Sequence, residues 1–353
     1  MELQLNRPKP ITTDVELILF KNRTDVKSTI DQLIDGNHVL ITGAYSNGID
    51  LIHELQKHLK YKYSNEHFKD QRVFRAEFQK LSKLILIEVI DHRLKVKKSP
   101  EIGWLEKLYP ELDRFLLPFT KIQGLNSAWQ WYTKGISYPV LRNKIHPYYG
   151  TYFPTRFDHL ILFDNWLKRY QGAKKSAIDV GVGCGVLSLQ MVKHGFQKVF
   201  GTDTNPNAIH GLIESMGDTK LSRKIELDYG NLFGKWEKQT ELIVFNPPWL
   251  PTSKKLGRLD EAIYYPNNLF PEFFEEAKKR LLPDGKILLL FSNLAQITKV
   301  TKEHPIENEL ANGGRFKLDS KYTKSVKSAS KKTTRDQNWR EEEVVELWVL
   351  ESL

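Results

Sequence analysis

Four consecutive residues, Asn246-Pro247-Pro248-Trp249, have the chemistry needed to hold a flat nitrogen-containing group. Proline lacks an N–H donor and fixes its own φ angle, so the two prolines hold the preceding carbonyl and the Asn246 side chain rigidly as hydrogen-bond acceptors. The indole of Trp249 supplies a flat stacking surface. The motif therefore suits an amine or amide nitrogen that must present its lone pair to an electrophile. Taken alone, it would be interpreted as a rigid loop that ends a strand.

A glycine-rich turn precedes this motif in the chain. In AIDVGVGCGVLSL, an apolar strand-like run leads through Gly181, Gly183 and Gly185 directly into an apolar helix-like run. Glycine lets the backbone turn tightly and approach a ligand closely, and the N-terminus of the following helix offers free N–H groups. By itself, such a triplet also fits a dinucleotide-binding loop or an ordinary turn.

A carboxylate, Asp203, ends the next strand-like run, KVFGTD. A carboxylate at the end of the strand that follows a glycine loop can bind both hydroxyls of a ribose. A helix cap or a turn is the alternative for an isolated aspartate. Because the glycine loop precedes it, we interpret Asp203 as a ribose-binding residue.

The elements that must position these residues alternate between strand and helix from Ser176 onward. The strand-like runs are short and mostly apolar on both faces, as is typical of buried parallel strands. The pattern predicts an α/β fold with a doubly wound sheet of βα units. The expected strands begin at Ser176, Lys198, Lys224, Glu241 and Lys286.

Three further elements are expected around this sheet. A helix over residues 157–170 precedes the first strand, and a second helix begins at Leu269 and is stopped by Pro283 and Gly285. A final apolar run from Val344 is expected to close an antiparallel edge of the sheet.

With these motifs in this order, residues from about 145 to 353 resemble the class I S-adenosylmethionine-dependent methyltransferases, specifically the small-domain group with an Asn-Pro-Pro-aromatic motif. That group includes adenine and guanine exocyclic-amine methyltransferases acting on DNA or RNA, and glutamine methyltransferases that modify protein-release factors. The resemblance implies S-adenosylmethionine as cofactor and a Rossmann-like methyltransferase sheet.

The resemblance also assigns roles to residues. It implies that the methionine part of the cofactor is lined by Asp179, Gly181, Gly183 and Gly185, and that Asp203 holds the ribose. Asn246 and the Pro247 carbonyl would accept hydrogen bonds from the target nitrogen, with Pro248 fixing the turn, Trp249 stacking on the target and Asn246 also reaching the cofactor. The cofactor would be covered by Phe153, Pro154 and Thr155. Asn231 would contact adenine where the family commonly has an acidic residue, and Asp228 is the nearby substitute.

The region before this resemblance predicts a second domain. Residues 1–140 are expected to form a mixed α/β substrate-recognition or accessory domain and residues 141–353 the methyltransferase domain, with the joint near Lys144–Arg156. The first domain contains one strand-turn-helix, from His38, and a helix expected over residues 74–86. VLITGAYSNGID begins like a phosphate loop, but no Gly-Lys-Ser/Thr follows Gly48, so nucleotide hydrolysis is not expected.

Composition narrows the remaining possibilities. The single cysteine, Cys184, excludes an intrachain disulfide, and its place in the glycine loop argues against a nucleophilic role. The histidines show no metal-ligand spacing, so no metal is predicted. The chain shows neither a signal-peptide pattern nor a membrane-spanning run, and a soluble, cytoplasmic protein is expected.

The net charge of the chain indicates which kind of molecule it binds. The net charge of +10 favours phosphate-rich partners, and Arg315–Arg340 carries nine Lys or Arg residues against two Asp. That segment is either a solvated basic loop or a surface that tracks a phosphate backbone. We expect an exocyclic amine of adenine or guanine, in RNA, as the target. A glutamine side-chain amide in a protein is the alternative, and a small molecule or a non-catalytic binding module remain open.

Overall fold

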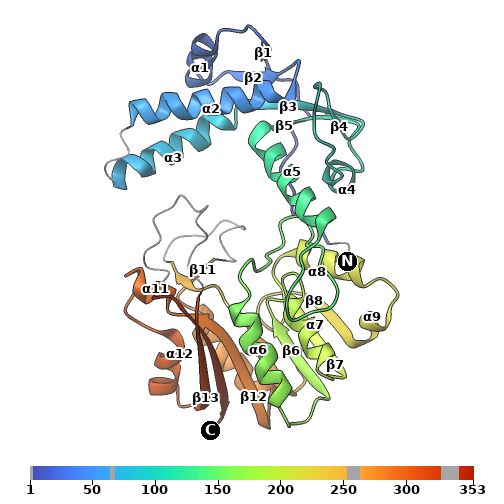
Figure 1. Ribbon diagram of the computed structural model, residues 1–353, viewed down its shortest axis with the longest axis vertical. Coiled ribbons are helices and arrows are strands. Elements are labelled where there is room, and N and C mark those ends of the chain that lie inside the picture. The colour runs from blue at the N-terminus through green and yellow to red at the C-terminus, as the bar shows by residue number, and fades with distance from the viewer. Residues whose placement is uncertain (1–2, 64–67, 253–262, 327–341) are drawn as a thin grey trace. The chain divides into compact units, whose positions relative to one another are not determined.

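The computed structural model describes residues 3–63, 68–252, 263–326 and 342–353. The chain forms two compact units (Figure 1). The N-terminal unit is Arg7–Thr133, and the catalytic unit is Lys134–Leu353 together with residues 3–6. Asn6 is tied to the catalytic unit because its backbone N–H donates to Asn207 Oδ1 at 2.7 Å and its side-chain amide donates to Asn205 Oδ1 at 3.0 Å.

The N-terminal unit is a mixed α/β domain, as predicted. Three strands are parallel, in the order β1-β2-β3, and β4 and β5 both pair antiparallel with β3. The strands are β1 Leu17–Phe20, β2 His38–Ile41, β3 Ile85–Ile90, β4 Arg93–Leu94 and β5 Arg114–Pro118. The helices are α1 Val26–Ile34, α2 Tyr45–Lys62, α3 Phe68–Ser82, α4 Trp104–Leu108 and α5 Phe119–Lys134.

One predicted helix in this unit is displaced toward the C-terminus relative to the observed helix α3. The helix expected to run to residue 86 ends at Ser82, and Ile85 and Leu86 instead begin β3, where they pair with Val39 and Leu40 of β2. Ile85 and Leu86 are fully buried. A short apolar run fits a buried strand or a buried helix equally well, and here the run forms a strand of the sheet.

The catalytic unit contains the predicted doubly wound sheet (Figure 1). Its seven strands have the order β13-β14-β12-β9-β6-β7-β8, and β12, β9, β6, β7 and β8 are parallel. The strands are β6 Ser176–Val180, β7 Lys198–Asp203, β8 Ile225–Tyr229, β9 Thr240–Phe245, β12 Leu281–Ser292, β13 Phe316–Ser325 and β14 Val344–Ser352, with a separate pair β10 Leu250–Pro251 and β11 Tyr264–Tyr265. The helical elements are α6 Asp158–Arg169, α7 Val186–Lys193, α8 Pro206–Met216, α9 Lys220–Lys224, α10 Leu269–Arg280, α11 Leu294–Ile297, α12 Pro305–Asn308 and a π-helical turn Glu309–Gly313.

Both faces of this sheet are covered, which explains the apolar strands. All six residues of β9 are buried. Leu242 and Val244 pack into one cluster with α6 and α7, whereas Ile243 and Phe245 pack into a second cluster with α10. Alternating side chains of one strand therefore reach opposite hydrophobic layers, and the strand needs no polar face.

Two predicted boundaries in the catalytic unit differ from the structure. The helix expected to reach Pro283 and Gly285 ends at Arg280, because β12 already begins at Leu281 with a register shift before Lys286. A proline is tolerated in a strand at such an irregularity. The run from Val344 is antiparallel, as predicted, but it lies inside the sheet, and β13 forms the edge.

Candidate functional site

The predicted site residues follow neighbouring parallel strands. The glycine turn follows β6, Asp203 is the last residue of β7, and Asn246 follows β9. These three strands are adjacent in the sheet, in the order β9-β6-β7. Because parallel strands end at the same edge, their loops form one crevice there.

The glycine turn is built on backbone that only glycine adopts easily. Gly181, Gly183 and Gly185 have φ angles of +69°, +50° and +81°. A Cβ atom on Gly183 would lie 3.2 Å from the Tyr152 carbonyl oxygen, so this segment approaches the turn closely. Side chains at these three positions would be strained.

Asp203 is fixed against the glycine turn. The Gly183 N–H donates to Asp203 Oδ2 at 2.8 Å, and the Asn205 N–H donates to Oδ1 at 2.8 Å. A carboxylate oxygen can accept more than one hydrogen bond, and hydroxyl groups are among the donors that it can bind. The structure therefore brings the predicted loop and the predicted ribose residue into direct contact.

Asp179 lies fully buried beneath the turn. The Ser188 hydroxyl donates to its Oδ2 at 2.5 Å, while Oδ1 has no hydrogen-bond partner within the described part of the chain. Burial raises the pKa of Asp179 to about 7, against the opposing effect of the Ser188 hydrogen bond. A buried carboxylate with a vacant oxygen is suited to meet a cationic group.

The segment before α6 reaches the same turn. Pro154 is buried, Phe153 is half-buried and Thr155 is exposed. The Tyr138 hydroxyl donates to the Pro154 carbonyl at 3.2 Å and lies 3.9 Å from Cys184 Sγ. Tyr138 thus connects this segment to the glycine turn, a role that nothing in the sequence indicated.

The Asn-Pro-Pro-Trp motif is partly buried. Asn246 Oδ1 is buried and finds no hydrogen-bond partner among the described residues. The Trp249 indole N–H donates to the Leu290 carbonyl at 3.3 Å, and its ring meets His159 edge to face with centroids 5.7 Å apart. These contacts anchor Trp249 and leave the Asn246 oxygen available to a ligand.

The segment predicted to contact adenine follows β8. Asn231 is exposed, and its carbonyl accepts the Gly234 N–H at 2.8 Å in a tight turn. Asp228, the suggested substitute, accepts the Lys235 N–H at 2.8 Å. Asp228 therefore stabilises this turn, and of the two side chains Asn231 is the exposed one.

Comparison with known proteins supports a methyltransferase. Residues 161–320, which include β6, the glycine turn, β7, β9 and β12, match the model of the methyltransferase small domain family. The protein is an S-adenosylmethionine-dependent methyltransferase.

Relatives of this methyltransferase carry different substrate names. A protein N5-glutamine methyltransferase of Methanocaldococcus jannaschii is 26% identical over 187 residues, covering 50% of this chain and 90% of the relative. A ribosomal protein L11 methyltransferase of Alkaliphilus metalliredigens is 32% identical over 80 residues, covering 23% of this chain and 25% of the relative. A ribosomal RNA small subunit methyltransferase C of Alcanivorax borkumensis is 33% identical over 78 residues, covering 22% and 23%. The chain thus spans about a quarter of the length of the last two relatives.

The cofactor of the methyltransferase fits the geometry at the sheet edge. S-adenosylmethionine carries an ammonium group and a ribose with two hydroxyls, and the turn offers the vacant Asp179 Oδ1 together with the Asp203 carboxylate. The close approach of Tyr152 to Gly183 leaves no room for larger side chains beside these groups. The two carboxylates are therefore suited to accept hydrogen bonds from the ammonium group and the ribose hydroxyls of this cofactor.

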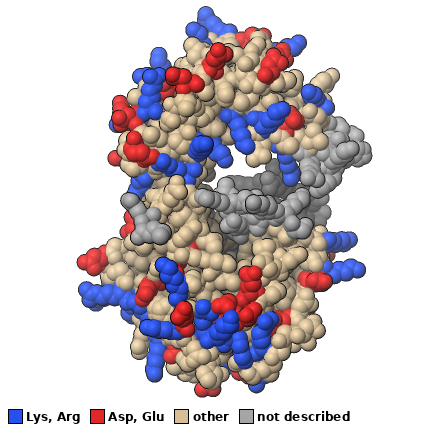
Figure 2. Space-filling model, turned by 180° about the vertical axis from the view of Figure 1, so that it is seen from behind, with Lys and Arg blue, Asp and Glu red and all other residues tan. Residues whose placement is uncertain are grey.

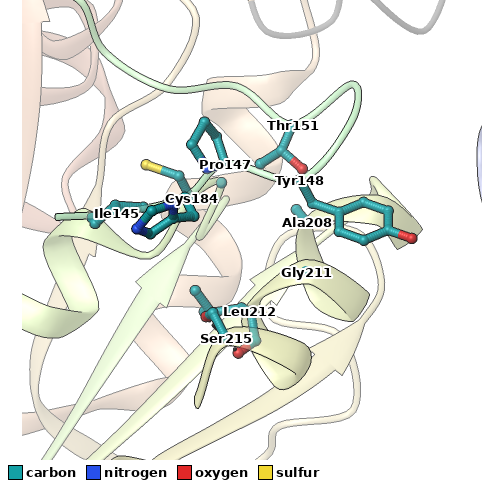
Figure 3. A pocket seen from close by; sticks show the side chains of 11 residues that line it. Ile145, Pro147, Tyr148, Thr151, Cys184, Ala208, Gly211, Leu212 and Ser215 are labelled. Carbon is teal, nitrogen blue, oxygen red and sulfur yellow. Dashed lines mark hydrogen bonds between the residues drawn. The ribbon is translucent and has the colours of Figure 1, made fainter. Parts of the chain in front are cut away.

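A small pocket of the methyltransferase lies next to the glycine turn (Figure 3). Its lining comes from the segment between Ile145 and Thr151, from Gly183 and Cys184, and from α8. Neither Asp179 nor Asn246 lines it, so it is separate from the predicted acceptor site. Burial raises the pKa of Cys184 to about 11, and the protonated thiol is a poor nucleophile.

Neither a metal-ligand group nor a membrane-spanning helix occurs among the described residues. Among the residues that the structure describes, no group of three or more His, Cys, Asp or Glu side chains is placed to hold a metal ion. Within the same residues, no helix has both the length and the apolar character needed to span a bilayer.

Proposed function

We propose that this methyltransferase transfers the methyl group to a planar nitrogen, specifically an exocyclic amine of adenine or guanine in RNA. The observation that carries the choice of nitrogen is the buried, unpartnered Oδ1 of Asn246 at the end of β9. A buried acceptor without a partner is costly unless a ligand supplies a donor, and an amine or amide N–H is such a donor.

Each site residue then has a defined task. The vacant Asp179 oxygen and the glycine turn would hold the methionine part of the cofactor, Asp203 its ribose, and Asn231 its adenine, while Phe153, Pro154 and Thr155 lie over it. Asn246 and the Pro247 carbonyl accept hydrogen bonds from the target nitrogen, Pro248 keeps the turn rigid, and Trp249 borders the target. When bound, S-adenosylmethionine supplies an already activated methyl group.

Methyl transfer on this arrangement depends mainly on position. The cofactor would supply the methyl group from its sulfonium and would leave as the thioether, and the target nitrogen would give up one proton. Acceptors at Asn246 and Pro247 hold the two N–H groups of the target, so its lone pair points away from them and toward the methyl group. Correct alignment of reacting atoms is worth several orders of magnitude in rate.

The preference for RNA rests on the whole-chain charge of +10. The described part of the predicted basic segment adds little, because three lysines of β13 are already in ion pairs. Lys317 lies 2.9 Å from Glu351, Lys321 lies 2.9 Å from Glu346, and Lys324 lies 3.0 Å from Asp158. On the face drawn in Figure 2, basic and acidic side chains of the catalytic unit are intermixed. The rest of the segment, 327–341, lies outside the described residues.

A glutamine side-chain amide in a protein is the second candidate. It is favoured by the archaeal relative, which bears the name of a protein glutamine methyltransferase and aligns with half of this chain. The same Asn246 acceptor would hold an amide nitrogen, so the geometry of the motif serves either target.

The test is transfer of labelled methyl from S-adenosylmethionine into separated RNA, DNA and protein fractions. We expect label in RNA, and we expect Asn246→Ala to reduce it by about a hundredfold or more, because the target loses its orientation. Asn165→Ala, at an exposed position of α6, is the matched control and should retain full transfer. Label confined to protein would move the assignment to the amide target.

A further inference from the structure

His159 is a buried histidine at the start of α6 whose ring has no hydrogen-bond partner among the described residues. The side chain is 2% exposed, and neither Nδ1 nor Nε2 is paired. Two unpartnered ring nitrogens make the folded state less stable than an apolar side chain of similar shape would. A residue of this kind calls for a reason other than packing.

The ring lies against the acceptor motif. His159 and Trp249 meet with centroids 5.7 Å apart and planes at 87°, so one ring presents its edge to the face of the other. The Trp249 N–H is already used by the Leu290 carbonyl, and it therefore does not satisfy the histidine. Trp249 lies three positions after Asn246, whose Oδ1 is likewise buried and without a partner among the described residues.

The environment keeps the imidazole neutral. Burial lowers the pKa of His159 to about 4, with Arg156 adding to this effect and Asp158 opposing it. A neutral imidazole has one N–H donor and one acceptor nitrogen. Either nitrogen can therefore make one hydrogen bond to a flat group, since adenine, guanine and a carboxamide each present both donors and acceptors.

The start of α6 is held in place by ion pairs of two residues just before the histidine. Asp158 pairs with Lys324 of β13 at 3.0 Å, and Arg156 pairs with Glu343, just before β14, at 2.6 Å. Glu343 is itself fully buried, and its Oε1 has no partner in the described part of the chain. These pairs fix the histidine backbone relative to the sheet, and a fixed group loses little freedom on binding a target.

We propose that His159 is a specificity-determining residue that hydrogen-bonds the methyl-accepting group held by Asn246. The proposal rests on the proposed function, since it takes the planar nitrogen site at Asn246 as given. It adds a recognition group from α6, outside the Asn-Pro-Pro-Trp motif, and it assigns one unpaired ring nitrogen of His159 to the methyl-accepting group and not to the cofactor.

The test uses the full-length enzyme with His159→Phe, which keeps a flat ring against Trp249 and removes both nitrogens. We expect label transfer into the RNA fraction to fall by about tenfold or more, the value of roughly one lost hydrogen bond. We expect the dissociation constant of S-adenosylmethionine, measured by calorimetry, to stay within about twofold and the thermal midpoint to be unchanged or higher. His159→Gln, which restores a donor and an acceptor, should recover part of the transfer.

The outcomes distinguish the role of His159 from the choice of RNA as the target. Full transfer by His159→Phe, or loss of transfer together with cofactor binding and thermal stability, would overturn the role of His159. Label that wild-type enzyme places only in protein would overturn the RNA assignment, and the same variants then test His159 on that protein fraction. Wild-type enzyme that labels no fraction would overturn both.

Discussion

At the scale of single residues, Asp179 links stability to cofactor binding. Its carboxyl group is completely buried, and burial raises its pKa to about 7 from an ordinary value of 3.8. The nearby charge of Asp203 adds to the increase. Near neutral pH the unliganded protein therefore holds a carboxyl that is partly protonated, and a cofactor ammonium group beside it would favour the ionised form.

This shift predicts how stability depends on pH. Between about pH 4 and about pH 7 the folded state binds more protons at Asp179 than the unfolded state does, so this group lowers the free energy of unfolding as pH rises through that window. Asp179→Asn should remove this slope and gain a few kcal/mol over wild type at about pH 8, with little difference at about pH 4. Urea unfolding of both proteins without cofactor measures it. The same slope in both would show that Asp179 is not the group responsible.

The sequence was informative about residues whose role is set by local backbone, and silent about the others. Gly183 and Asp203 were expected at one site, and the structure joins them by a hydrogen bond. Tyr138 and His159 owe their positions to contacts between segments far apart in the chain. No spacing or motif in the sequence predicts such contacts, because they depend on how α6, the glycine turn and the loop after β9 pack together.

At the scale of elements, the junction between the glycine turn and α7 is tightly constrained. Gly185 caps α7 with φ +81°, and a Cβ atom there would lie 2.4 Å from Leu212 Cδ1. Leu212 is 6% exposed and cannot move aside freely. The junction therefore requires glycine for two independent reasons, backbone conformation and close approach of α8.

A pair of variants separates these reasons. Gly185→Ala should lower the free energy of unfolding by about 2–4 kcal/mol, from the positive φ angle and the overlap together. Gly314→Ala is the matched comparison, since Gly314 has φ +64° in the same left-handed conformation as Gly185 but no atom within 4 Å of the added Cβ, and it should cost only about 1–2 kcal/mol. Chemical denaturation gives both values. Equal losses would mean that Leu212 relaxes and that the contact does not constrain the turn.

Strand prediction succeeded where burial leaves a clear pattern. The five expected parallel strands are all present, because β6, β7, β9 and β12 are largely buried and read as apolar runs. β13 was not expected, since its residues are mostly polar and much of what holds it at the edge is its pairing with β14 and its ion pairs. A polar edge strand stabilised by a partner strand cannot be distinguished from a basic loop by composition alone.

At the scale of the whole molecule, charge separates the two target classes. The net charge of +10 attracts phosphate at long range, but the lysines of β13 that would have extended a basic surface are paired with acidic residues. The number of phosphates that the enzyme engages is therefore the quantity that discriminates an RNA target from a protein amide.

Salt dependence measures that number. An enzyme that contacts about three phosphates of a single strand should show an acceptor KM that rises by roughly tenfold or more between about 50 and 200 mM salt, because bound counterions are released on association. The KM for S-adenosylmethionine, a single ligand held by Asp179, Asp203 and the glycine turn, should change by less than about twofold over the same range. An acceptor KM that stays flat would contradict an RNA target, since screening has little effect on an uncharged amide held by Asn246 and stacked beside Trp249.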